Sequence, residues 1–198
     1  MSGHSVNEHT LKQLFLEAHT YNQWSDQIIS DETLKQLYDL TKMPPTSANC
    51  QPLRVVFLRS DTAKQELKPF MAEGNIEKTI SAPAVALLAY DTEFYEELSY
   101  LFPQTDAKSW FVGKDKFIQS TAIRNSSLQG GYFILAARAL GLDCGPMSGF
   151  NAKGVNEHFF SDGRHKINFI CNLGYGEETS GYNDRNPRFM FDQACKIL

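Results

Sequence analysis

Apolar residues recur at helical spacing in the first part of the chain. They predict one helix over 11–20 and a second that begins at Ser30 and ends before Pro44–Pro45. Ser30 is a good N-cap, and the two acidic residues after it suit the positive end of the helix dipole. A further helix is expected over about 62–71, so the first third of the chain is predominantly helical.

Three short apolar runs predict buried strands. They are Leu53–Leu58 (LRVVFL), Ala84–Tyr90 (AVALLAY) and Asn168–Leu173 (NFICNL), each of strand length and rich in apolar residues. The runs are separated by helical segments rather than by hairpin turns. Helices and strands are therefore intermixed along the chain.

One long, largely apolar helix is predicted from about Phe117 to Leu140, ended by Gly141. Gly130 and Gly131 lie in its interior, where each costs roughly 1 kcal/mol relative to Ala. Two in succession indicate close packing against another backbone. A helix this apolar is buried, so residues 1–198 are predicted to form a single α+β domain. We expect a mixed central sheet flanked by helices, with the long helix at its centre.

Residues 91–116 have no regular period and are rich in aromatic residues. So much aromatic surface among turn residues is more typical of a mobile lid than of a core element. We therefore expect this segment to cover a site.

Composition excludes several classes of protein. The net charge is −4 and the basic residues are scattered, which argues against a nucleic-acid partner. No run of about eighteen apolar residues occurs, so no membrane span is expected, and the polar N-terminus lacks the features of a signal peptide. The four cysteines form no C-x-x-C pair, so neither a metal site nor a disulfide framework is indicated. These features predict a cytoplasmic protein with reduced thiols.

Two polar segments are candidates for ligand binding. In the loop 45–52 (PTSANCQP), hydroxyls and amides suit a polar ring edge or a sugar, although they serve equally to turn the chain. Asn75 and Lys78 share one face of a helical turn and together suit a heteroaromatic ring edge or a developing negative charge. A solvated helix start is the alternative for this second segment.

Two further candidates lie later in the chain. The segment 141–150 (GLDCGPMSGF) combines Gly145 and Gly149, which allow backbone approach to a ligand, with a stiffening Pro146. Its alternative is a constrained connector between helices. Arg185 and Arg188 flank a proline and suit a phosphate. The alternative is a chance pair of basic residues with no binding role.

In this order the four segments resemble the nitroreductase family, over nearly the whole chain. The resemblance implies bound FMN, NADH or NADPH as electron donor, and a homodimer with FMN at the interface. It also implies a set of cofactor-binding residues: His19, Thr20, Asn22, Pro45, Thr46, Ser47, Asn49, Asn75, Lys78, Pro146, Met147, Ser148, Gly149, Arg185 and Arg188. Lys78, which would stabilise the charge of reduced flavin, and the Gly149 amide near flavin N5 are the implied catalytic groups.

The chain departs from the family pattern in two places. The N-terminal phosphate motif of the family is rich in arginine, but residues 18–22 (AHTYN) contain no Arg or Lys. Thr20 keeps a hydroxyl, and the positive charge is expected from Arg185 and Arg188. Ser148 stands where an acidic residue is often found, which removes a negative charge near the flavin.

A narrower resemblance is to the members of the family that reduce malonic semialdehyde in pyrimidine degradation. It rests on the stretches MPPTSANC, DTEFYE, DAKSWF, RNSSLQ and GLDCGPMSGF. Arg124 and Lys108 are candidates to bind the substrate carboxylate, with a solvated surface position as the alternative for each. Two other functions stay open, a broad NAD(P)H nitroreductase or quinone reductase and a non-catalytic flavin- or nucleotide-binding protein. The chain has no G-x-G-x-x-G loop from which a preference between NADH and NADPH could be inferred.

Overall fold

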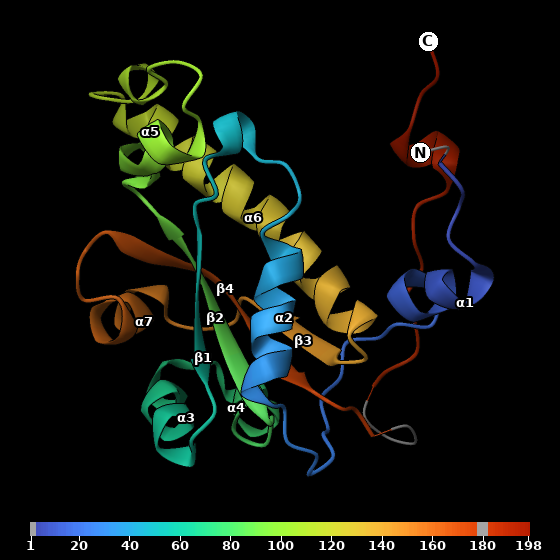
Figure 1. Ribbon diagram of the computed structural model, residues 1–198. Helices are drawn as coiled ribbons and strands as arrows, with labels where there is room; N and C mark the ends of the chain where they lie inside the picture. The colour runs from blue at the N-terminus through green and yellow to red at the C-terminus, as the bar shows by residue number, and fades with distance from the viewer. Residues whose placement is uncertain (1–2, 178–181) are drawn as a thin grey trace.

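The computed structural model describes residues 3–177 and 182–198 and has the α+β fold that the sequence predicts (Figure 1). Its four strands form one sheet in the order β1-β2-β4-β3. All strand pairs in the described ranges are antiparallel, so the expectation of a mixed sheet is wrong. The apolar pattern of a strand carries no information on its direction, which the connections between strands decide.

The strands are β1 (Leu53–Leu58), β2 (Ala84–Asp91), β3 (Asp143–Met147) and β4 (His165–Gly174). The α-helices are α1 (Glu8–Leu11), α2 (Asp31–Thr41), α3 (Asp61–Leu67), α4 (Glu73–Ile80), α5 (Leu98–Leu101), α6 (Asp115–Ala139), α7 (Ala152–Phe159) and α8 (Phe191–Ala194). Short π- or 3₁₀-helical turns are η1 (Lys12–Leu16), η2 (Ser47–Asn49), η3 (Lys68–Phe70), η4 (Phe94–Glu97) and η5 (Lys108–Trp110). None of the helices in the described part of the chain is long and apolar enough to cross a membrane.

The central strand β2 separates two hydrophobic cores. Successive side chains of a strand point to opposite faces, so Ala86 and Leu88 pack with residues of α2 and α6. Val85 and Leu87 point the other way and pack with residues from α3, α4 and α7. The sheet is therefore covered by helices on both faces (Figure 1), which explains the uninterrupted apolar run of β2.

The long helix α6 is held close to the sheet at Gly130. A Cβ on this residue would lie 2.5 Å from the ring of Phe169 on β4, whereas one on Gly131 would meet nothing within 4 Å. The expected close approach is thus confirmed at Gly130 only. It is made against an aromatic side chain and not against a backbone.

The aromatic segment between β2 and α6 has its own core. Phe94, Leu98 and Phe111 are buried, and the rings of Phe94 and Phe111 meet edge to face at 5.0 Å. The expectation of a lid without core character is therefore wrong for the inward half of the segment. Tyr100 on its outer side is 82% exposed.

Elsewhere the structure differs from the sequence prediction in element type. The helix expected over 11–20 is limited to α1 and η1. The carbonyls of Leu14, Leu16 and Ala18 accept hydrogen bonds from arginine side chains. Part of the loop expected over 141–150 is strand β3. The helical turn expected around residues 75–78 is confirmed as part of α4.

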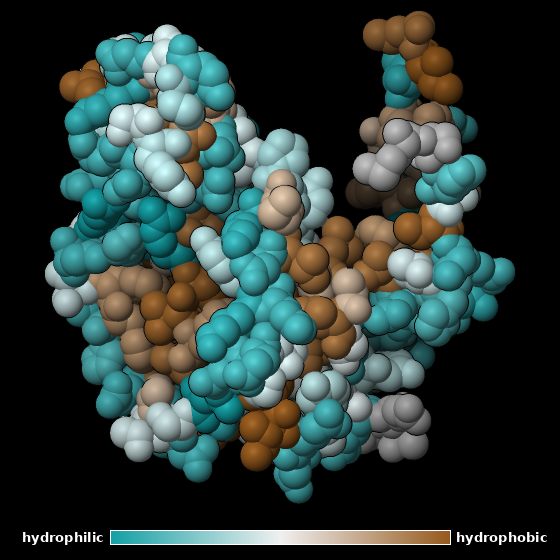
Figure 2. Space-filling model, viewed as in Figure 1, coloured by the Kyte–Doolittle hydropathy of each residue, from teal (hydrophilic) through white to brown (hydrophobic). Residues whose placement is uncertain are grey.

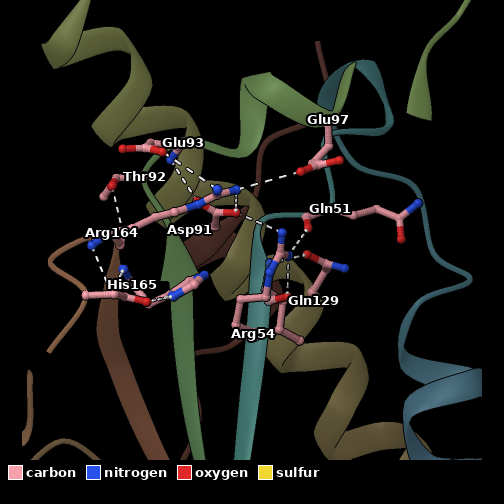
Figure 3. A network of polar contacts seen from close by, with 11 residues as sticks. Gln51, Arg54, Asp91, Thr92, Glu93, Glu97, Gln129, Arg164 and His165 are labelled. Atoms are coloured by element: carbon pink, nitrogen blue, oxygen red, sulfur yellow. Dashed lines mark hydrogen bonds and ion pairs between the residues drawn. The ribbon is translucent and has the colours of Figure 1, made fainter. Parts of the chain in front are cut away.

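A buried carboxylate joins the ends of three segments (Figure 3). Asp91 closes β2, is fully buried, and accepts two bonds of 2.6 Å from Arg164 and one of 2.8 Å from Arg54 of β1. It also accepts a 2.8 Å bond from the N–H of Glu93, where the aromatic segment begins. Burial opposes ionisation, but the bonds from Arg164 and Glu93 and the two positive charges hold the pKa of Asp91 below its usual value.

We expect Asp91→Asn to lower the free energy of unfolding by about 3–5 kcal/mol at pH 7, since two guanidinium groups lose their buried partner. A depressed folded-state pKa stabilises the protein above the unfolded pKa, about 3.9, and that contribution is lost as pH falls through the folded pKa. In urea denaturation, the difference between wild type and variant should therefore persist from pH 7 to 5 and close below about pH 4.

Asp39→Asn provides the control, because Asp39 is an exposed carboxylate paired with Lys42. This substitution should change the free energy of unfolding by less than about 1 kcal/mol. Equal effects of the two substitutions at pH 7 would contradict a stabilising role for the Asp91 network.

Candidate functional site

A polar pocket of about 450 Å³ lies where the N-terminal and C-terminal segments pass the ends of α4 and α6. Segments near the two termini run beside each other at this end of α6 (Figure 1). The pocket collects six of the residues predicted from sequence to bind a cofactor: His19, Thr20, Asn22, Lys78, Arg185 and Arg188. With Arg138, four Lys or Arg side chains line the pocket, compared with the one carboxylate of Asp184 among the lining residues described. This excess of positive charge suits an anionic group.

The N-terminal side of the pocket is held against β3. The N–H of Tyr21 donates to the carbonyl of Cys144 at 3.1 Å, and Thr20 forms an isolated parallel bridge with Cys144. A Cβ on Gly145 would lie 2.9 Å from the carbonyl oxygen of Tyr21. Glycine is therefore required here for close approach of two backbones, and this contact sets the position of Thr20 and its neighbours.

Two arginines tie the N-terminal segment to the rest of the pocket. Arg185 donates to the carbonyls of Leu16 and Ala18, both at 2.8 Å. Arg138, in the last turn of α6, donates through Nη1 to the carbonyl of Leu14 at 3.0 Å. Its Nε is buried and has no partner in the described part of the chain. Both guanidinium groups thus keep donors beyond those used by the protein.

Lys78 stands between the polar pocket and a second hollow of about 530 Å³. Its carbonyl accepts bonds of 2.9 Å from the indole of Trp24 and from the amide of Asn172. These two donors fix the last turn of α4 on the sheet. The side chain of Lys78, a half-buried residue, is therefore presented from a rigid backbone.

The loop 146–149 lies against the same helix. The carbonyl of Gly149 accepts a 3.0 Å bond from the amide of Asn75, and the Thr79 hydroxyl donates to the sulfur of Met147 at 3.5 Å. The N–H of Gly149 lies in an exposed stretch, and no acceptor for it occurs among residues 3–177 and 182–198. The structure thus brings Asn75, Lys78 and Gly149 to one side of the sheet, with a backbone donor available there.

The loop 45–52 lies elsewhere. The N–H of Ser47 donates to the amide oxygen of Asn125 on α6 at 2.9 Å, and Asn49 donates to the carbonyl of Leu101 at 2.8 Å. The Thr46 hydroxyl accepts a 3.1 Å hydrogen bond from the N–H of Gln51 in the same loop. Asn125 and Arg138 are about 20 Å apart along α6, at 1.5 Å per residue. Pro45, Thr46, Ser47 and Asn49 are therefore not part of the polar pocket of their own chain.

The two candidates for the substrate carboxylate also lie outside this pocket. Lys108 pairs with Glu96 at 2.5 Å within the aromatic segment, and Arg124 is an exposed residue of α6 beside Asn125. Arg138, by contrast, was not predicted from the sequence. Its one signal there is a cation in the last turn of a largely apolar helix.

Comparison with known proteins gives consistent matches. A family model described as the nitroreductase family matches residues 17–175. A relative from Polynucleobacter asymbioticus, provisionally named NADH dehydrogenase/NAD(P)H nitroreductase, is 58% identical over 98% of each chain.

Solved structures share the fold at low sequence identity. A provisionally assigned nitroreductase from Bacillus subtilis has a TM-score of 0.84 at 22% identity, covering 97% of this chain and 100% of its own. Another, from Exiguobacterium sibiricum and in complex with FMN, has a TM-score of 0.83 at 17% identity and covers 100% of both chains.

We expect Gly145→Ala to lower the free energy of unfolding by about 1–3 kcal/mol, because the added Cβ pushes the N-terminal segment off β3. Gly74→Ala is the matched control, since a Cβ there meets nothing within 4 Å in helix α4. That substitution should leave stability unchanged or raise it by up to about 1 kcal/mol. Urea denaturation measures both, and a Gly145→Ala variant as stable as wild type would show that the contact with Tyr21 relaxes freely.

Proposed function

The chain belongs to the nitroreductase family, and from this premise we propose that it is a cytoplasmic, FMN-dependent NAD(P)H oxidoreductase that reduces malonic semialdehyde to 3-hydroxypropionate. The observation that carries the proposal is the polar pocket with its four cationic side chains, Lys78 of α4 among them. Gly149, whose N–H has no acceptor among the described residues, packs against the same helix through Asn75. An anionic flavin has a phosphate, which would lie in the polar pocket, and a heteroaromatic ring, which would lie beside α4.

The residues present fit such a cofactor. The pocket holds more cationic than anionic side chains, and the buried Nε of Arg138 has no partner among the described residues. A buried donor without an acceptor is unfavourable, so a phosphate oxygen at this end of the pocket would satisfy it. The pocket thus supplies both the charge and the donors that FMN requires.

FMN, when bound, supplies hydride transfer from NAD(P)H to a second substrate, in two half-reactions that share one pocket. Asn75 would bind the polar edge of the ring, and Lys78 would stabilise negative charge that develops there. The Gly149 N–H would orient the ring by donating to its N5. No protein side chain is needed as a nucleophile in this reaction.

Malonic semialdehyde as the substrate rests on the sequence stretches that resemble the enzymes of pyrimidine degradation. The substrate is a carboxylate, so a cation near the ring should bind it, with Arg124 and Lys108 as candidates. The name carried by the Polynucleobacter relative favours a second candidate function, a broad NAD(P)H nitroreductase. The ratio of kcat/KM for malonic semialdehyde to that for nitrofurazone separates the two.

We expect the purified protein to show visible flavin bands, to bleach with NADH or NADPH under anaerobic conditions, and to recover its colour on addition of malonic semialdehyde. Lys78→Met should retain flavin and slow the bleaching about ten- to a hundredfold, because it removes one charge-stabilising group. Lys153→Met, on the exposed face of α7, is the control and should bleach at the wild-type rate.

Recovery of the flavin colour with nitrofurazone but not with malonic semialdehyde would indicate that the substrate is a nitro compound. A protein that holds flavin but is not bleached by either nicotinamide would instead be a non-catalytic flavin-binding protein. Absence of bands, with no binding of added FMN, would overturn the enzymatic proposal.

A homodimer follows from the same proposal. The predicted flavin contacts fall into two groups about 20 Å apart along α6, which one chain cannot bring around a single ring, whereas a second chain could supply the missing group. The outward face of α6 exposes Ile123, Leu128 and Tyr132. Apolar surface is also visible on the C-terminal arm in Figure 2, where Ile197 and Leu198 are almost wholly exposed. Both surfaces suit burial against a second copy.

Sedimentation velocity should show a dimer for the wild-type protein and a shift towards monomer for Leu128→Asp, because a charge on the face of α6 would be buried at the interface. Ile28→Asp is the matched control, since Ile28 is 76% exposed and lies far from α6 in the chain. A monomeric wild-type protein would contradict the shared site.

A further inference from the structure

We propose that Arg138, in the last turn of α6, binds the flavin phosphate and thereby replaces the arginine that the N-terminal segment lacks. This inference rests on the proposed function, because it concerns the cofactor of that same site. It adds a binding residue that lies outside all four of the segments singled out by sequence.

The hydrogen bonds of Arg138 leave part of its guanidinium group available. Nη1 donates to the carbonyl of Leu14 at 3.0 Å, while Nε is buried without a partner among the described residues. The side chain lines the polar pocket together with His19, Thr20 and Arg185. A planar guanidinium that lines a pocket of positive charge and keeps donors unused by the protein is suited to a phosphate oxygen.

The other cations of the pocket are less well placed for this role. Arg188 donates to the carbonyls of Asn186 and Pro187 in its own exposed segment, and Arg185 already donates twice to the N-terminal segment. Lys78 lies on α4, beside the expected ring. Arg138 instead follows Ala136 and Ala137, which are buried against the sheet, so its backbone is held rigidly before any ligand binds.

Two structural roles compete with phosphate binding. Arg138 could clamp η1 to α6, since its carbonyl also accepts a 2.7 Å bond from Gln13. It could also act as a counter-charge to Asp143, because burial raises the pKa of that carboxyl and the charge of Arg138 opposes the rise. Either role would affect the fold of the pocket as a whole. Neither would distinguish a flavin with a phosphate from one without.

The experiment therefore compares FMN with riboflavin, which has the same ring and ribityl chain and no phosphate. Each is titrated into flavin-free protein, with the quenching of flavin fluorescence as the readout. Arg138→Met should weaken FMN binding about ten- to a hundredfold, the range for loss of a charge-assisted hydrogen bond. Riboflavin binding should change less than about twofold. Lys153→Met removes the same charge from an exposed position on α7 and should leave both affinities unchanged.

Each outcome either supports or overturns the phosphate-binding role of Arg138. Equal loss of both flavins in Arg138→Met would identify a structural clamp and overturn the inference, as would an unchanged preference for FMN. A wild-type protein that binds neither flavin would overturn the proposed function, and the inference with it. If thermal melting shows that Arg138→Met does not fold, Arg138→Lys keeps the charge and loses the planar fork. A reduced ratio of FMN to riboflavin affinity in that variant supports the inference, and an unchanged ratio overturns it.

Discussion

The packing of α6 against the sheet is the contact on which the rest of the structure depends. Gly130 lets the helix approach Phe169, and Phe133, Ala136 and Ala137 fill the core beneath it. A helix of 25 residues held in this way is a rigid spacer. It places Asn125, which holds the loop 45–52, and Arg138, which lines the polar pocket, at a fixed separation. The two groups of predicted flavin contacts are apart for this reason, and the dimer proposed above would bring one group from each chain to a single site.

Two arginine environments show how the same side chain serves stability and binding. Around Asp91, the guanidinium groups of Arg54 and Arg164 meet a buried carboxylate that accepts from both. This network fixes the end of β2 and the start of the aromatic segment. At Arg138 the protein supplies an acceptor for Nη1 and none, in the described ranges, for the buried Nε. A satisfied arginine stabilises the fold, whereas an unsatisfied one in a pocket is available to an anionic ligand.

Residues 18–22 contain no arginine, yet they border a pocket that Arg138, Arg185 and Arg188 also line. His19 stacks on Tyr182 at 4.1 Å, and the carbonyls around it accept from Arg138 and Arg185. The segment keeps its position beside the pocket while the positive charge comes from residues far away in sequence.

The sequence by itself determined the α+β class, the buried strands β1, β2 and β4, the long central helix and the family, because apolar periodicity and short motifs are local properties. The strand direction, β3, the packed core of the aromatic segment and the role open to Arg138 required the tertiary structure. Each depends on contacts between residues far apart in the chain: Cys144 with Tyr21, Phe94 with Phe111, Arg138 with Leu14. An arginine at the end of a largely apolar helix carries no signal until the fold brings the two terminal segments to it.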